Sequence, residues 1–177
     1  MKKKVALIGS GNILFKDEGL GVYIVEYIEK NYDFSAPVDI IEGGSLGLRL
    51  MELLQEYEEV IIVNTASEKN RVPGEIIVKT TEQFLEGEQV KKTAGEVEIA
   101  EMLQVCSLEG NSAKTTVVSI VPNDILSVEA GVSEVLREEW EKYIQTLLEQ
   151  LESLGVAAEQ RENCIELDEI VKSLFNS

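Results

Sequence analysis

The sequence contains no histidine among its 177 residues. Histidine is the commonest general base and the commonest metal ligand, and it is the base in Ser-His and Cys-His nucleophile pairs. Any chemistry in this chain must therefore depend on carboxylates, amides, hydroxyls, lysines or a metal held without imidazole.

Cysteine and long apolar runs are also scarce. The two cysteines, Cys106 and Cys164, have no CxxC spacing, and a chain of this length needs no disulfide framework. The apolar run after the first lysines is too short for a signal peptide, and no run reaches membrane-spanning length. We therefore expect a cytoplasmic protein with no membrane partner.

Basic residues are few, with 16 Lys and Arg against 33 Asp and Glu and a net charge of −17. Because nucleic-acid-binding proteins neutralise phosphates with clustered Lys and Arg, this balance argues against a nucleic-acid partner. The apolar fraction of 44% and the charged fraction of 28% are ordinary for a globular protein. The length fits a single domain spanning residues 1–177.

Short apolar runs rich in Val and Ile predict strands buried on both faces. These runs span residues 4–9, 38–42, 60–64, 76–79 and 115–120. Apolar residues at helical spacing predict helices over 46–57 and 99–106, a long helix from 136 to 154 that Ser133 caps and Gly155 stops, and a last helix over 167–175. The alternation predicts a three-layer α/β/α sandwich around a mostly parallel sheet of about five strands. The polar, acidic stretch 80–93 is interpreted as a loop or flap.

In open α/β sheets, ligands bind beyond the carboxyl ends of the strands. The first such position is the turn Gly9-Ser10-Gly11-Asn12. Leu14 stands where a dinucleotide-binding turn would have its third glycine, the next helix is expected to start only around Glu18, and no Walker lysine follows. The glycine spacing therefore argues against a nucleotide-binding function.

The acidic pair Asp17-Glu18 precedes that helix and has two interpretations. The two carboxylates could simply complement the helix dipole. Alternatively, Glu18 could be a divalent-metal ligand, assisted by oxygen ligands from neighbouring strand ends such as Glu42 and Asn64.

Taken in chain order, these segments resemble the nickel–iron hydrogenase maturation endopeptidases. The resemblance rests on Gly9-Ser10-Gly11-Asn12 with Asp17-Glu18-Gly19-Leu20-Gly21, on Glu42-Gly43-Gly44-Ser45-Leu46-Gly47, on the strand ending in Asn64-Thr65-Ala66, on Pro73-Gly74, on Val118 to Pro122, and on the helix beginning at Ser133. It covers residues 4–154 and leaves a C-terminal tail, 156–177, outside.

The resemblance implies a phosphorylase/hydrolase-like fold and removal of a C-terminal extension from the hydrogenase large subunit after nickel insertion. It also implies that nickel, supplied in the substrate, is recognised by a glutamate, an aspartate and a histidine. The glutamate falls on Glu18, the aspartate position holds Asn64, and the histidine position falls near Gly95. Because an uncharged amide is a poor ligand and Gly95 has no side chain, Glu96 is a possible substitute ligand. We expect no tightly bound cofactor.

Two functional hypotheses remain at this point. The first is a divergent maturation protease that still cuts the hydrogenase large-subunit precursor. The second is a non-proteolytic degenerate relative that binds a protein partner. Under either hypothesis, the residues expected to contact the substrate or partner follow the first two strands: Asn12, Asp17, Glu42, Gly43, Gly44 and Ser45.

Overall fold

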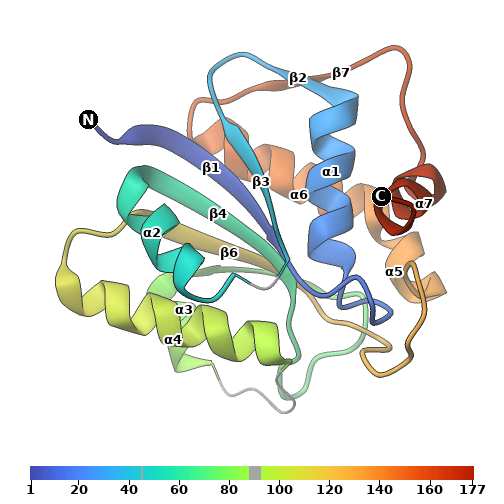
Figure 1. Cartoon of the computed structure of the whole chain (residues 1–177), viewed down its shortest axis with the longest axis horizontal. Coiled ribbons are helices and arrows are strands. Elements are labelled where there is room, and N and C mark those ends of the chain that lie inside the picture. The colour runs from blue at the N-terminus through green and yellow to red at the C-terminus, as the bar shows by residue number, and fades with distance from the viewer. Residues whose placement is uncertain (45, 88–92) are drawn as a thin grey trace.

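The computed structural model describes residues 1–44, 46–87 and 93–177. Over these residues the chain forms alternating strands and helices around one main sheet (Figure 1). In chain order the elements are β1 Lys3–Ser10, α1 Leu20–Asn31, β2 Tyr32–Phe34, β3 Asp39–Gly44, α2 Leu48–Glu56, β4 Tyr57–Thr65, β5 Ile76–Thr80, α3 Thr81–Glu86, α4 Ala94–Glu109, β6 Lys114–Ile120, α5 Glu134–Glu138, α6 Trp140–Ser153, β7 Ala158–Gln160 and α7 Leu167–Phe175.

The main sheet has the strand order β3-β1-β4-β6-β5. The first four strands of this order pair in parallel, and β5 pairs antiparallel with β6 at the edge. This arrangement confirms the predicted mostly parallel five-stranded sheet. In the described part of the chain, no helix combines the length and the apolar character needed to cross a bilayer.

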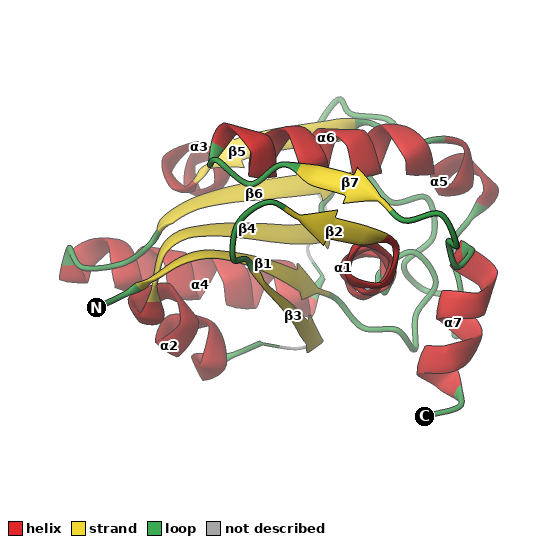
Figure 2. Ribbon diagram, turned by 90° about the horizontal axis from the view of Figure 1, so that it is seen from above, coloured by secondary structure: helices red, strands yellow, loops and turns green. Residues whose placement is uncertain are grey.

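Each face of the sheet packs against its own layer of helices, and Figure 2 shows these layers edge-on. On one face, side chains of β1 and β4 such as Ile8 and Ile62 pack against α2, α3 and α4. On the other face, Leu7 and Ile61 belong to an apolar cluster with α1 and α6, which α7 joins by packing on α1. Because neighbouring residues of a strand point to opposite faces, strands buried on both sides have the continuous apolar runs seen in the sequence.

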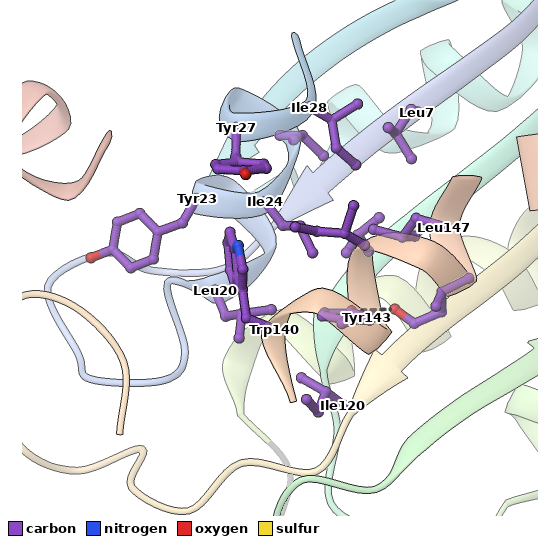
Figure 3. Close-up of a cluster of buried hydrophobic side chains, with 14 of the residues drawn as sticks. Leu7, Leu20, Tyr23, Ile24, Tyr27, Ile28, Ile120, Trp140, Tyr143 and Leu147 are labelled. Carbon is purple, nitrogen blue, oxygen red and sulfur yellow. Dashed lines mark hydrogen bonds between the residues drawn. The ribbon is translucent and has the colours of Figure 1, made fainter. Parts of the chain in front are cut away.

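The core between α1 and α6 combines aromatic and aliphatic side chains (Figure 3). The rings of Tyr27 and Trp140 meet edge to face, with centroids 5.4 Å apart and an interplanar angle of 85°. Tyr143 is fully buried beneath β4 and β6, and its hydroxyl donates to the backbone oxygens of Asn64 and Val118 at 3.0 and 2.7 Å. This hydroxyl ties α6 to the end of the sheet where strands β4 and β6 finish.

Four local predictions differ from the structure. The long helix predicted over 136–154 is two helices, α5 and α6, which meet at Glu139 with φ −92° and ψ 0°. Ser133 makes no side-chain capping bond, because its hydroxyl donates instead to Asp17. The first helix begins at Leu20 rather than around Glu18. Within the stretch 80–93, predicted as a loop or flap, residues 81–86 form α3, and 88–92 lie outside the described residues.

The C-terminal tail 156–177 is folded onto the domain. Its strand β7 pairs antiparallel with β2. Its helix α7 confirms the helix predicted over 167–175, and it packs on α1. The side chain of Asn31 holds the tail by donating to the backbone oxygen of Ile165 at 2.9 Å and accepting from its nitrogen at 2.7 Å.

Candidate functional site

The candidate site lies where the carboxyl ends of β1 and β4 meet. After β1 the chain passes through α1 to β3 on one side of the sheet centre, and after β4 it passes to β5 and β6 on the other. In open α/β sheets such a reversal leaves a crevice at the strand ends, which is the usual position of a binding site. The first residues of α4, on the α2–α4 face, line this crevice. Figure 1 shows the position of α4 relative to the sheet.

Two adjacent hollows, whose linings share Gly11, Glu18 and Gly95, occupy the crevice. The wide pocket has a volume of about 310 Å³, and its lining includes Asn12, Ile13, Glu18, Val22, Glu42 and Gly95. The inner cavity has a volume of about 10 Å³, and its lining includes Ser10, Glu18, Asn64, Thr93, Gly95 and Glu96. Glu18, Asn64 and Gly95, which are far apart in the sequence, are therefore brought together by the fold.

Glu18 lines both hollows. It is half-buried, and this burial raises the pKa of its carboxyl above 4.5. Its backbone is closely packed, because a Cβ atom at Gly11 would lie 2.0 Å from the Glu18 carbonyl oxygen. Only glycine fits at that position, where φ is also +153°. The glycine-rich turn thus serves to hold Glu18 against the end of β1.

Asp17, the preceding residue, has no exposed surface. One carboxylate oxygen accepts from the backbone nitrogen of Ser133 at 2.6 Å. The other accepts from the Ser133 hydroxyl at 2.9 Å and from the backbone nitrogens of Asn123 and Asp124 at 2.9 and 2.8 Å. We call this set of bonds the Asp17 clasp. The predicted substrate contact of Asp17 is not open to a substrate here, because every part of the carboxylate is covered by the loop it holds.

Asn64 stands at the end of β4 and is 3% exposed. Its side chain lies on the same face as that of Ile62, toward the inner cavity and the start of α4. Its Oδ1 accepts from the Ser119 hydroxyl at 2.5 Å. Its Nδ2 is buried and has no hydrogen-bond partner. Among the buried side-chain nitrogen and oxygen atoms of the described ranges, it alone is unpaired.

Gly95 lies in the first turn of α4 with open space around it. A Cβ atom there would meet nothing closer than the hydroxyl oxygens of Thr93 at 3.8 Å and Ser10 at 3.9 Å. Glu96, the predicted substitute ligand, is 1% exposed and forms a capping box with Thr93. Its two carboxylate oxygens accept from the backbone nitrogens of Ser67 at 3.1 Å and Thr93 at 2.7 Å. To ligate a metal, this carboxylate would have to give up bonds that hold the helix start.

The remaining predicted contact residues surround the rim. Asn12 is exposed, and its Oδ1 accepts from the backbone nitrogen of Leu14 at 3.0 Å. Glu42 has an exposed side chain, yet desolvation at its carboxyl raises its pKa, with repulsion from two glutamates of α1 adding to the effect. Gly43 packs closely, since a Cβ there would lie 2.8 Å from the carbonyl oxygen of Gly9. Gly44 lines the wide pocket, and Ser45 lies outside the described residues.

The donor set does not match a three-ligand metal site. Among the described residues, no group of three or more Asp, Glu or Cys side chains is placed to hold a metal ion. The three positions that the resemblance assigns to nickel recognition hold one carboxylate, one amide and one residue without a side chain. Of these three positions, only Glu18 carries an ionisable group, and the Nδ2 of Asn64 is buried without a hydrogen-bond partner.

Comparison with known proteins gives this site its context. The family model described as hydrogenase maturation protease matches residues 22–150. The chain belongs to the hydrogenase maturation protease family. It is 28% identical over 160 residues to the hydrogenase 2 maturation protease of Escherichia coli, covering 90% of this chain and 97% of that protein. It is also 28% identical to the hydrogenase expression/formation protein HupD of Rhizobium leguminosarum, covering 89% of this chain and 79% of that protein.

The fold agrees with solved structures of the same family. The hydrogenase maturating endopeptidase HybD from Escherichia coli superposes with a TM-score of 0.78 at 26% identity, covering 91% of this chain and 98% of that one. A maturation protease from Thermococcus kodakarensis shares the fold with a TM-score of 0.62 at 19% identity, covering 85% of this chain and 94% of that one. The family resemblance predicted from the ordered motifs is thereby confirmed.

Sequence reasoning missed two residues that hold Asn64 in position through hydrogen bonds. Ser119, which anchors the amide of Asn64, and Tyr143, which donates to its backbone oxygen, carried no local signal. The capping box was readable, because Thr93 and Glu96 have the Thr-x-x-Glu spacing ahead of an apolar helix. That spacing predicts that Glu96 caps the start of the helix rather than binding a ligand.

Proposed function

We propose that this protein is a hydrogenase maturation protease that removes the C-terminal extension of a nickel–iron hydrogenase large-subunit precursor. The observation that carries the proposal is the family membership over most of the chain, combined with a half-buried Glu18 that lines two adjacent hollows. The nickel belongs to the substrate, so the protein itself would hold no tightly bound cofactor.

The wide pocket supports a protein substrate. Its volume of about 310 Å³ and its mixture of carboxylates, an amide and apolar side chains suit a short peptide segment. Asn12 and Glu42 at the rim and Gly43 and Gly44 beside them are the residues we assign to substrate contact. The proposal includes a cytoplasmic location, which agrees with two cysteines that are not disulfide-bonded.

The alternative of a non-proteolytic relative that only binds a partner is not favoured, because the named relatives are maturation proteins of hydrogenases. The two hypotheses make different predictions for a single assay. A protease shortens the precursor, whereas a binding protein forms a complex with it and leaves its mass unchanged.

The test is incubation of the protein with the nickel-loaded, unprocessed large subunit of its host's hydrogenase, followed by intact-mass spectrometry. The expected result is loss of a C-terminal segment from the precursor. Glu18→Gln removes the carboxylate at nearly constant shape and should abolish the shortening. Glu101→Gln, an exposed residue on α4, is the matched control and should cut at the wild-type rate. A precursor of unchanged mass after incubation with wild-type protein would refute the proposed activity.

A further inference from the structure

β3 is an edge strand whose outer side has no partner strand. It stands first in the strand order of the main sheet and pairs with β1 alone (Figure 2). Among the described residues, the backbone–backbone hydrogen bonds of β3 lead only to β1 and to Gly11 in the turn that follows it. An edge strand of this kind presents a row of unpaired N–H and C=O groups along its outer side.

β3 is also the exposed margin of the sheet. None of its six residues, Asp39–Gly44, is buried, whereas the last six residues of β1 and of β4 are all buried. Ile40 and Ile41 point to opposite faces, are only partly buried, and lie at the margins of the two apolar cores. A strand added beyond β3 would therefore extend both apolar faces of the sheet and cover these two side chains.

The carboxyl end of β3 leads into the wide pocket. Glu42 and Gly44 line that pocket together with Glu18. Gly44 has no side chain to cover its backbone, and a Cβ atom there would meet no atom within 4 Å, so another chain can approach closely at this point. Among the described lining residues of the wide pocket, none comes from β5, the strand at the opposite edge. Of the two edges, β3 is the one that runs into the site.

We propose that the C-terminal segment of the precursor binds as an added strand along the outer edge of β3 and passes from there into the wide pocket, where it meets Glu18. This inference rests on the proposed function, because it takes the large-subunit precursor as the ligand. Strand addition takes its affinity from main-chain hydrogen bonds. It suits an extension at a chain end, because such segments are poorly ordered unless another structure holds them.

Amide hydrogen exchange tests where the precursor binds. The nickel-loaded precursor is added to Glu18→Gln, which should leave it uncut, and exchange is followed by mass spectrometry. Exchange over residues 39–44 should slow by about tenfold in the complex, because outward-facing amides of β3 gain hydrogen-bond partners. The other edge strand, residues 76–80, is the matched control in the same molecule and should exchange as before. A complex in which residues 39–44 exchange as in the free protein would overturn the inference.

Backbone N-methylation of the precursor tests how it binds. The large subunit is ligated to synthetic C-terminal segments that each carry one N-methyl group, and affinity for Glu18→Gln is measured by calorimetry. Because alternate N–H groups of an added strand point to β3, every second position should weaken binding by about fivefold, the factor that one net hydrogen bond represents. The positions between them should match the unmethylated ligated precursor. Weakening without this alternation would contradict strand addition, because a segment held by its side chains has no such period.

The outcomes separate this inference from the proposed function. A wild type that cuts the precursor while residues 39–44 stay unprotected in the complex refutes strand addition alone. A precursor that protects residues 39–44 but is not shortened by the wild type refutes the protease function alone. A precursor that neither binds nor is cut refutes both. Protection of β3 that rises with the concentration of the protein alone would place a second copy on this edge and would also refute the inference.

Discussion

The Asp17 clasp offers the sharpest test of how the site is held together. Asp17→Asn changes one carboxylate oxygen to an NH₂ group, and the new residue can adopt the same backbone conformation. Asp17 has φ of +54°, and asparagine adopts this left-handed conformation as readily as aspartate does. The substitution therefore isolates the effect of the charge and of one acceptor.

The magnitude follows from the contacts. One carboxylate oxygen accepts three hydrogen bonds and the other accepts one, from the backbone nitrogen of Ser133 at 2.6 Å. In the Asp17→Asn variant, the new side chain would keep its amide oxygen at the three-bond position and turn its NH₂ group toward the Ser133 nitrogen, so two donors would face each other. A buried hydrogen bond to a charged group contributes about 1.5–3 kcal/mol, and an unsatisfied buried donor costs about 1–3 kcal/mol. Allowing for relaxation of the surface loop, we expect a loss of about 3 kcal/mol in the free energy of unfolding.

Urea unfolding measures this loss through the fluorescence of Trp140, the single tryptophan, which is 7% exposed in the core. The midpoint should fall while the slope with urea stays constant. Asp124→Asn is the matched control, since the Asp124 carboxylate accepts hydrogen bonds within its own loop, from Leu126 and Ser127, and the variant should show a clearly smaller loss. A loss below about 1 kcal/mol in Asp17→Asn would refute the reasoning that the clasp holds the loop.

Further predictions concern the strand ends, the thiols and the pH dependence of stability. Tyr143→Phe removes a buried hydroxyl that donates to two backbone oxygens, and it should lower the free energy of unfolding by about 1–2 kcal/mol in the same urea assay. A thiol reagent should modify Cys164 in the native protein and reach buried Cys106, whose thiol pKa is raised by burial, only after unfolding. Hydrogen bonds from a tyrosine and a lysine lower the pKa of Asp39 below 3.8, so its stabilising contribution is present above that pH and is lost as the pH falls through the folded-state pKa. In Asp39→Asn, the free energy of unfolding should therefore fall less steeply as the pH is lowered, in unfolding curves measured between about pH 2 and pH 5.

The main sheet was predictable because its strands are short, apolar and rich in β-branched residues. Each of the five predicted runs corresponds to a strand of the sheet. The break between α5 and α6 was not predictable, since the apolar spacing continues in phase across Glu139 and only the backbone conformation there interrupts the helix. The strands β2 and β7 are three residues each, too short for alternation to show in the sequence.

The site was predictable in outline and not in detail. Parallel strands place their carboxyl ends at one edge, so Glu18 and Asn64 could be expected to approach each other. Which atoms are satisfied could not be foreseen. The Asp17 clasp joins residues more than 100 positions apart, and the amide of Asn64 is oriented by Ser119 on a neighbouring strand. Hydrogen-bond pairing of this kind depends on the folded arrangement and leaves no periodic pattern in the sequence.

The two adjacent carboxylates of the first turn have different roles, since Asp17 holds a loop in place and Glu18 lines the candidate site. The left-handed conformation at Asp17 turns its side chain into the loop 123–133, where four donors cover it. The next residue, Glu18, then faces the two hollows, half-buried and with its backbone held against Gly11. Of this adjacent pair, only the Glu18 carboxylate therefore lines the site, whereas the Asp17 carboxylate is used to hold the loop.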